Sequence, residues 1–547
     1  MNRVKKLVSK ANRQLTIQLA AFLLAGSSLL SSLLGLLRDR LLMSNYYDTY
    51  KTGIDAYTVA FVIPDFMFFL LVSGALSVTF IPVFSQRLAT GNKKSAWELS
   101  SSLVNFMALI TLAASLLIII FAEPLVRFVA GPGLDETSRG LAVSMMRVIA
   151  VNPFLFAIAS VVASMQQAIG RFTFFALAPT IYNLGIIFGI TVLANGVNLF
   201  GFQLFEGGIM GVALGVVLGS IMQLIVSSVG LIGMGFDYDF KIRWKNRGFR
   251  KVLKLLPPRS FDQGIDYFNN IVETNLASRL GAGMVTAYQR ATTLHMMPVT
   301  LIGVAISTAA FPRMSERLAA GRVDLFKSEL RAVLRVIIWL ALPTAVITFF
   351  TRGYIVSFIK NGGDLLIANI LGVLAVAILF RSIYHIAARS FYARQDTRTP
   401  LYISIITITL NIFLAVVFVL RFGLGVYGLA LAQALVSIVE VVILFLIMAI
   451  RMPGLFDTSF IHAVSRMVSA SGLMGLISYV SVKLLDLSAR DQSFFTTFPK
   501  FAVIVAISLI SYLLICRLFK LEEPEPVIKK IASLAFGQFK PQAKVEP

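Results

Sequence analysis

Runs of mostly apolar residues alternate with short polar segments along the chain, and each run is long enough to cross a lipid bilayer as a helix. A spanning helix needs about 20 such residues, and the pattern predicts about fourteen spans. The predicted spans are Leu15–Leu37, Ala56–Phe80, Leu99–Ala122, Leu141–Ala163, Phe174–Ala194, Ile209–Met234, Leu255–Leu280, Thr286–Phe311, Val333–Phe350, Ile367–Ala388, Leu401–Leu420, Val426–Ile450, Met467–Leu484 and Phe501–Cys516.

Basic residues in the connecting segments predict the orientation of these spans. Segment 236–254 is rich in Lys and Arg, whereas segment 195–208 has neither. Short basic segments also follow the other even-numbered spans, and cytoplasmic loops carry an excess of Lys and Arg. We therefore expect these loops and both termini in the cytoplasm. The polar seventh span is kept because the alternation requires it, and the first run is too long for a cleaved signal peptide.

An internal repeat relates the two halves. The residues Ala75-Leu76-Ser77, Pro82, Ser85, Arg87 and Gly91 recur at a constant offset as Ala305-Ile306-Ser307, Pro312, Ser315, Arg317 and Gly321. The offset covers an even number of spans, so the halves have the same orientation, as parallel repeats do. We predict an all-α polytopic membrane protein with two parallel-related six-helix bundles (1–235 and 255–450), a basic cytoplasmic linker (236–254), and two further helices with a cytoplasmic tail (451–547).

Composition excludes several classes of protein. Of the 547 residues, 57% are hydrophobic and 14% are charged, which is too apolar for a soluble chain. The net charge of +22 lies in the loops and does not indicate nucleic-acid binding. One cysteine, three scattered histidines and the lack of a P-loop or Gly-x-Ser-x-Gly motif argue against zinc enzymes, ATPases and hydrolases. We therefore expect no cofactor, and a secondary transporter, not an enzyme.

Polar residues within the spans are the candidates for function, because a charge at mid-helix costs roughly 2.5–3.5 kcal/mol on insertion scales. Arg38, Asp39 and Arg40 end the first span, and Arg290 lies early in the eighth. The cluster at the first span is consistent with an interfacial position near lipid headgroups, and Arg290 with pairing to another helix. Both positions are also open to a functional role.

The seventh span carries one polar face, formed by Asp262, Asp266, Asn269, Asn270 and Glu273. Their spacing places them on one side of a helix, which cannot face lipid. We expect this face to line a water-filled cavity, while a ladder of buried ion pairs is the alternative. A site for a hard cation is also open, since carboxylates and amides bind such ions. Arg381, His385 and Arg389 form a second stripe, on the tenth span, with Arg389 expected at the membrane interface.

Several motifs resemble those of the MurJ/MviN family. They are Leu34-Gly35-Leu36-Leu37-Arg38-Asp39, Asp55-Ala56-Tyr57 with Ile63-Pro64, Phe80-Ile81-Pro82, Ala178-Pro179 with Asn183, and Phe391-Tyr392-Ala393-Arg394-Gln395-Asp396-Thr397-Arg398-Thr399-Pro400. The resemblance implies a fourteen-helix fold of the MOP exporter superfamily. It also implies transport of lipid II, the undecaprenyl-pyrophosphate-linked peptidoglycan precursor, from the inner to the outer leaflet.

The same resemblance implies a cationic cavity for the pyrophosphate, with Arg38, Asp39, Asp55 and Arg290 matching residues of the family motifs. Four expected side chains are replaced in this chain, and one of them is the glutamate of an Ala-Glu-Gly step, where this chain has Ser73. Ser32 stands where the family has an arginine, and Phe68-Phe69 stand where it has a pair of arginines. Arg147 is a candidate for supplying the missing charge.

The resemblance favours a lipid II flippase that works by alternating access in a bacterial inner membrane. Its expected partners are the lipid-linked substrate and membrane lipids, and we expect a monomer that operates beside the cell-wall synthesis machinery. Two alternatives from the same superfamily are a flippase for another lipid-linked oligosaccharide and a cation-coupled multidrug exporter. A membrane glycosyltransferase would need a long acidic extracellular loop, and the predicted loops are short.

Overall fold

The computed structural model describes residues 17–72, 75–199, 202–488 and 491–525, with only the backbone described at 17–18, 20–22, 25, 75–78, 197–199, 202–204, 255 and 257–263. It forms two compact units, Met1–Thr286 and Ala287–Pro547. Each predicted span coincides with one helix or with two consecutive helices, so the all-α prediction is confirmed. One small exception is a hairpin of two short antiparallel strands in segment 195–208, where the sequence predicted only a loop.

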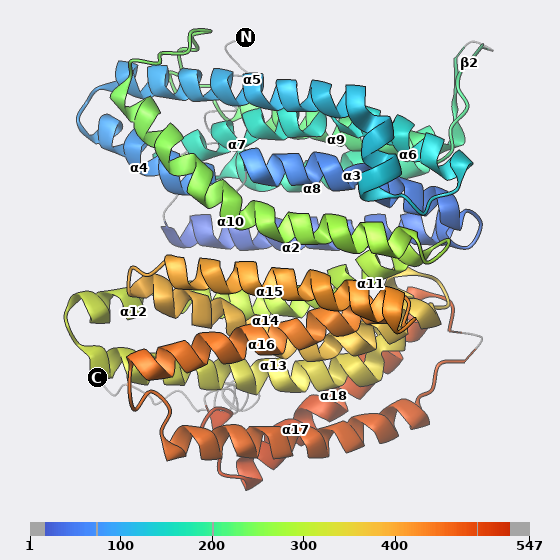
Figure 1. Ribbon diagram of the computed structural model, residues 1–547, viewed down its shortest axis with the longest axis vertical. Coiled ribbons are helices and arrows are strands. Elements are labelled where there is room, and N and C mark those ends of the chain that lie inside the picture. Colours follow the sequence, from blue (N-terminus) through green and yellow to red (C-terminus); the bar gives the residue numbers. More distant parts are fainter. Residues whose placement is uncertain (1–16, 73–74, 200–201, 489–490, 526–547) are drawn as a thin grey trace, which may run out of the picture. The chain divides into compact units, whose positions relative to one another are not determined.

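The first unit contains the following elements, which Figure 1 colours from blue to green. They are α2 (Ile17–Leu42), η1 (Met43–Tyr47), α3 (Lys51–Leu71), α4 (Ala75–Ala89), α5 (Lys93–Pro124), η2 (Leu125–Ala130), α6 (Glu136–Ile149), α7 (Asn152–Ile169), α8 (Thr173–Thr191), η3 (Leu193–Asn195), β1 (Val197–Leu199), β2 (Phe202–Phe205), α9 (Ile209–Val229) and α10 (Arg247–Ser278).

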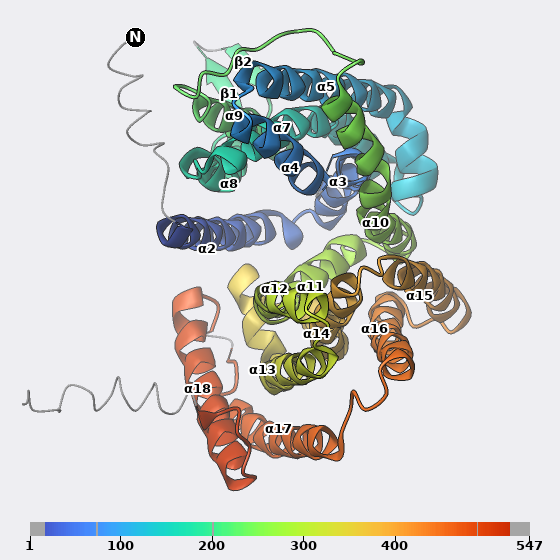
Figure 2. The same ribbon diagram turned by 90° about the vertical axis from the view of Figure 1, so that its left-hand side faces the viewer.

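Helix α11 (Met284–Val299) begins at the end of the first unit and continues into the second. The second unit then contains η4 (Thr300–Val304), α12 (Ala305–Ala319), α13 (Val323–Ile359), α14 (Leu365–Ala393), α15 (Arg398–Val416), η5 (Val417–Arg421), α16 (Val426–Arg451), α17 (Thr458–Leu484) and α18 (Phe494–Leu518). Helices α17 and α18 pack against each other and against α13 (Figure 2).

Twelve helices or joined helix pairs in the described ranges are long and apolar enough to cross a membrane. Helices α2 and α10 are not among them. For these two, crossing stays a prediction, which for α10 rests on the alternation of loop charge. The protein is thus a multi-pass α-helical membrane protein whose helix order follows the predicted spans.

The internal repeat is confirmed by matching contacts. In the first unit Arg87 Nη1 donates to the carbonyl of Ser95 at 2.8 Å, and in the second Arg317 Nη1 donates to the carbonyl of Leu325 at 3.0 Å. In both units the bond ties the end of one helix to the start of the next. The repeat extends to helix packing, because α5 with α7, α7 with α9 and α8 with α9 correspond to α13 with α14, α14 with α16 and α15 with α16.

Glycines let α8 and α9 cross with their backbones in contact. A Cβ added at Gly185 would lie 2.3 Å from the Cα of Gly219, and one at Gly189 would lie 2.7 Å from the Cα of Gly215. The glycines of each helix are four residues apart, so they form one smooth stripe. Small residues allow this close approach within a bilayer, where apolar surfaces gain little by leaving lipid.

The boundary between the units differs from the sequence-based one. Residues 247–254, which were assigned to a basic linker, form the first turns of α10, and α10 packs on α3, α4 and η2 of the first unit. Asn246 caps α10 by accepting from the backbone N–H groups of Gly248 and Phe249, and Arg87 donates to the same side chain at 2.6 Å. The linker itself lies along α5, where Asn105 donates to the carbonyl of Asp239 at 2.8 Å.

Candidate functional site

The polar end of α2 forms an ordered cluster within the first unit. Arg38 donates to Asp39 Oδ1 through Nε at 3.0 Å and through Nη2 at 2.9 Å, and its Nη1 donates to Asn183 Oδ1 on α8 at 3.2 Å. Asn183 is oriented in turn by donating to the carbonyl of Ser31 at 3.1 Å. The Arg38 side chain is nevertheless 26% exposed. The hydrogen bonds therefore hold the Arg38 guanidinium in one orientation, and part of its side chain remains accessible at the surface of the unit.

Asp55 has a different environment from Arg38. It is 1% exposed, near the start of α3. Its Oδ2 accepts from the backbone N–H of Gly283 at 2.6 Å, and its Oδ1 accepts from the N–H and the hydroxyl of Thr286 at 2.8 and 2.7 Å. These are free donors at the beginning of α11, where a helix has N–H groups without intrahelical partners. In this structure Asp55 thus caps a helix, and the prediction that it contacts cargo stays untested.

The polar face of α10 is exposed only in part. Asp266 is exposed and Asn269 is half-buried, whereas the side chain of Asp262 lies outside the described residues. Glu273 is 5% exposed and accepts a hydrogen bond from Asn269 at 2.9 Å, so it departs from the expectation that it faces water. The reason is the packing of the C-terminal half of α10 on α3 and η2, which covers that end of the face.

Arg147 does not join the Arg38 cluster. It is exposed on α6, and its Nε donates to the carbonyl of Ile119 on α5 at 3.3 Å. It therefore has no contact that would place it beside the anion site predicted at Arg38. Of the predicted site residues the structure brings together Arg38 with Asp39, and Asn269 with Glu273. Asn183, named before only as part of a motif, joins the Arg38 cluster.

The second unit encloses its own polar network. Arg290 is buried on α11, and Tyr288 on the same helix donates to Gln433 on α16 at 3.2 Å. On α14, Arg381 Nη1 lies 3.6 Å from Glu440 Oε2. Sequence reasoning missed Glu440, although a lone glutamate within an apolar span is a signal that was available.

Glu440 is 4% exposed, and its other oxygen accepts from the hydroxyls of Ser404 at 3.3 Å and Thr407 at 3.2 Å. Arg389 is partly exposed and donates to Ser307 and to the carbonyl of Val304, and its position at the membrane interface stays a prediction. The buried carboxylate of Glu440 therefore holds α14, α15 and α16 together and orients Arg381.

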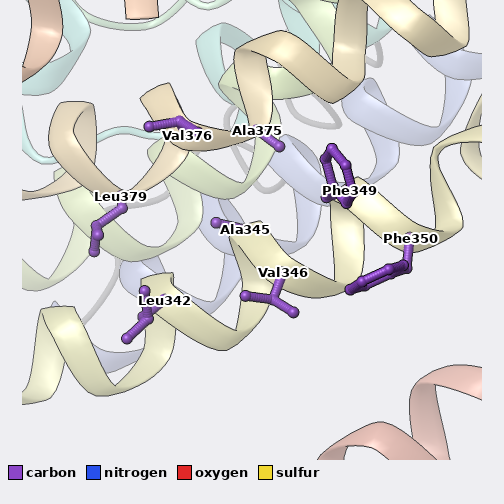
Figure 3. A pocket seen from close by; sticks show the side chains of 8 residues that line it. All are labelled: Leu342, Ala345, Val346, Phe349, Phe350, Ala375, Val376 and Leu379. Carbon is purple, nitrogen blue, oxygen red and sulfur yellow. The ribbon is translucent and has the colours of Figure 1, made fainter. Parts of the chain in front are cut away.

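A groove between α13 and α14 is lined only by apolar side chains and has a volume of about 240 Å³ (Figure 3). The lining residues are Leu342, Ala345, Val346, Phe349, Phe350, Ala375, Val376 and Leu379. Such a lining accepts a hydrocarbon chain but offers no donor to a phosphate. Within the described part of the chain no group of three or more His, Cys, Asp or Glu side chains could hold a metal ion.

The fold and the intramembrane polar groups define a class of protein. Two repeated bundles of spanning helices in the same orientation are an architecture found among membrane transporters. Solved structures agree at the level of the fold. A lipid II flippase MurJ in an inward closed conformation matches with a TM-score of 0.74 at 24% identity, over 91% of this chain and 98% of that one. An inward-facing MATE multidrug transporter of the MOP superfamily matches with a TM-score of 0.63 at 15% identity, over 78% and 96%.

The particular family follows from sequence comparison. The family model described as lipid II flippase MurJ matches residues 50–505, so the chain belongs to that family. A probable lipid II flippase MurJ of Thermotoga maritima is 25% identical over 91% of this chain and 96% of its own length. A lipid II flippase MurJ of Burkholderia cenocepacia is 26% identical over 83% and 89%.

Proposed function

We propose that this protein moves lipid II from the inner to the outer leaflet of a bacterial cytoplasmic membrane as a secondary transporter. Membership of the MurJ family supports the cargo. The observation that carries the site is Arg38, which two partners orient while a quarter of its side chain remains exposed. In this proposal both termini are cytoplasmic and the protein acts by alternating access.

Arg38 has the chemistry to bind the pyrophosphate of the cargo. A guanidinium has five N–H donors, and the three hydrogen bonds to Asp39 and Asn183 use one on each nitrogen. Two donors, one on each terminal nitrogen, remain for phosphate oxygens, and arginine keeps its charge when water is removed. Asp39 neutralises part of the positive charge while no cargo is bound. An arriving anion would therefore compete with Asp39 for the same guanidinium.

Arg290 is the corresponding candidate in the second unit. We propose that it contacts the same cargo during transport, on the ground that a buried arginine within a spanning helix marks a substrate path or a partner. Its contribution is tested separately from that of Arg38, because each residue belongs to its own unit.

The membrane potential favours outward movement of such a cargo. Each negative charge that leaves a negative cytoplasm gains roughly 2.3 kcal/mol per 100 mV. A pyrophosphate diester carries about two charges, so the gain is on the order of 4–5 kcal/mol at 100 mV. No nucleotide hydrolysis is needed to drive a flip of this kind.

A second candidate function is supported by the residues that replace arginine. Phe68 and Phe69 pack in an aromatic cluster, so this part of the first unit offers no positive charge to a phosphate. This feature favours a flippase for a different lipid-linked oligosaccharide, or a multidrug exporter, over a lipid II flippase with the usual set of arginines.

The test is transport of fluorescent lipid II in proteoliposomes that contain the purified protein. We expect Arg38→Ala and Arg290→Ala each to reduce flipping at least tenfold, and Arg38→Lys to retain part of the activity because the charge remains. Arg127→Ala is the matched control, since Arg127 is an exposed arginine of the first unit, and it should flip at the wild-type rate. Wild-type rates in both Arg38→Ala and Arg290→Ala would refute the anion site. Failure of the wild-type protein to flip lipid II, with transport of another polyprenyl-pyrophosphate sugar, would support the second candidate.

A further inference from the structure

An acidic residue and two aromatic residues share one face of α3 in the place where the family has arginines. Asp65, Phe68 and Phe69 are at positions i, i+3 and i+4, which lie on the same side of a helix. Asp65 is partly buried in the C-terminal half of this span. The sequence pattern therefore replaces a cationic surface with an acid bordered by rings.

Five rings from four helices of the first unit form a continuous chain around this position. Tyr267 on α10 stacks on Phe69 with the ring centroids 3.8 Å apart and the planes 13° from parallel. Phe69 contacts Phe68 edge to face at 5.2 Å, Phe68 contacts Phe156 on α7 at 5.6 Å, and Phe156 contacts Tyr182 on α8 at 5.3 Å. A tyrosine thus stands at each end of the chain.

Asp65 lies on the same face of α3 as Phe68 and Phe69, and it interacts electrostatically with both terminal tyrosines, Tyr182 and Tyr267. In the described part of the protein Asp65 has no hydrogen bond or ion pair. A carboxylate within a membrane span is costly without a partner, and aromatic faces attract cations through their negative π-surface. A cation is therefore the kind of ligand that this arrangement would stabilise.

The surrounding groups select the kind of cation. An inorganic ion such as Na⁺ or Ca²⁺ is normally surrounded by several oxygen ligands. Here Asp65 is the partly buried carboxylate, whereas Asp266, which also interacts with Tyr267, is exposed. A ring-lined site with one partly buried carboxylate is suited to an organic ammonium group, which gains from aromatic faces and donates to one acceptor. We propose that Asp65 and the aromatic residues around it form a binding site for a primary ammonium group.

This site adjoins the proposed anion site. Tyr182 also interacts electrostatically with Arg38, and its neighbour Asn183 accepts a hydrogen bond from Arg38. A ligand with a phosphate and an amino group could therefore engage both. In that form the inference rests on the proposed function, and it identifies the cargo as one whose headgroup carries a free amine.

The first experiment measures ligand binding alone, so that it does not depend on transport. Isothermal titration calorimetry of the purified full chain in detergent would compare n-butylammonium with n-butanol, its neutral analogue, and with sodium at constant ionic strength. We expect saturable binding of n-butylammonium only. Asp65→Asn should weaken it at least tenfold and Phe69→Leu about threefold to tenfold. Glu123→Gln, which removes an exposed carboxylate of the same unit, should bind as the wild type does.

Three results would overturn the site. They are equal binding of n-butanol, wild-type affinity in Asp65→Asn, and saturation by sodium with no effect of Phe69→Leu. If Asp65→Asn fails to fold, the Phe69→Leu variant and the three ligands still decide the outcome. The anion site is separated by Arg38→Ala, which should stop flipping but keep n-butylammonium binding. If Arg38→Ala loses transport and still binds n-butylammonium, the ammonium site and the anion site are separate, as proposed. If Arg38→Ala also loses n-butylammonium binding, the two sites are not separate.

Discussion

Replacing Asp55 should destabilise the start of α11. Its carboxylate is 1% exposed and accepts three hydrogen bonds, from the N–H of Gly283 and from the N–H and hydroxyl of Thr286. Hydrogen bonds to a charged group contribute about 1.5–3 kcal/mol each, but burying the carboxylate offsets part of that sum. A helix cap by itself is worth about 1–2 kcal/mol. We therefore expect Asp55→Ala to lower the free energy of unfolding by about 3 kcal/mol.

The assay is thermal unfolding of purified protein in detergent. For domains of 150–250 residues a loss of this size lowers Tm by roughly 6–12 °C. Asp55→Asn should be almost as unstable, because the amide nitrogen would face an N–H donor. Thr286→Val removes the hydroxyl only and should cost about 1 kcal/mol. In the double variant the two losses should not add, since both remove the same bond.

A Tm of Asp55→Ala equal to that of the wild type would refute the capping argument. The same variant also tests the earlier expectation that Asp55 contacts cargo. If flipping of lipid II is lost while Tm is unchanged, Asp55 acts on the cargo directly. If activity falls only in proportion to the loss of folded protein, its role is to hold the start of α11.

Three further predictions concern packing, pH and topology. Gly215→Val should prevent folding because its Cβ would lie 2.5 Å from the backbone of α8, whereas Gly472→Val, in open space on α17, should give normal yields on size-exclusion chromatography. Burial would raise the pKa of Asp396, but hydrogen bonds and an ion pair lower it to about 2. The stabilisation from the ionised carboxylate is therefore present above pH 4 and lost as the pH falls through 2. Asp396→Asn should lower the free energy of unfolding by about 1–2 kcal/mol at pH 7, measured by chemical unfolding, and this difference should shrink on acidification. For topology, an impermeant thiol reagent applied to intact cells should label Glu206→Cys but not Lys245→Cys, both exposed positions, and the opposite labelling would reverse the orientation.

Apolar run length and loop composition were sufficient to locate the helices. Each run of the required length forms one helix or two consecutive helices, because the tendency to enter a bilayer and to satisfy backbone groups there is a local property of about 20 consecutive residues. The repeat was also readable, since Arg87 and Arg317 make the same bond to the start of the following helix. The boundary between the two units could not be read from the sequence, because α10 is polar and its position depends on which helices it packs against.

The roles of the intramembrane polar residues depend on contacts between helices that are distant in the chain. Asp55 belongs to a motif near the start of α3, and its carboxylate accepts from Thr286, more than two hundred residues later. Glu273 has the spacing of a water-facing residue and is buried by packing of α10 on its neighbours. The rings of α7, α8 and α10 that form a chain with Phe68 and Phe69, on the face of α3 that carries Asp65, could not be predicted from the sequence either. Periodicity shows on which side of a helix a residue lies, but the packing of whole helices determines which residue it meets on that side. The helices could therefore be predicted from the sequence, whereas the contacts between their polar residues could not.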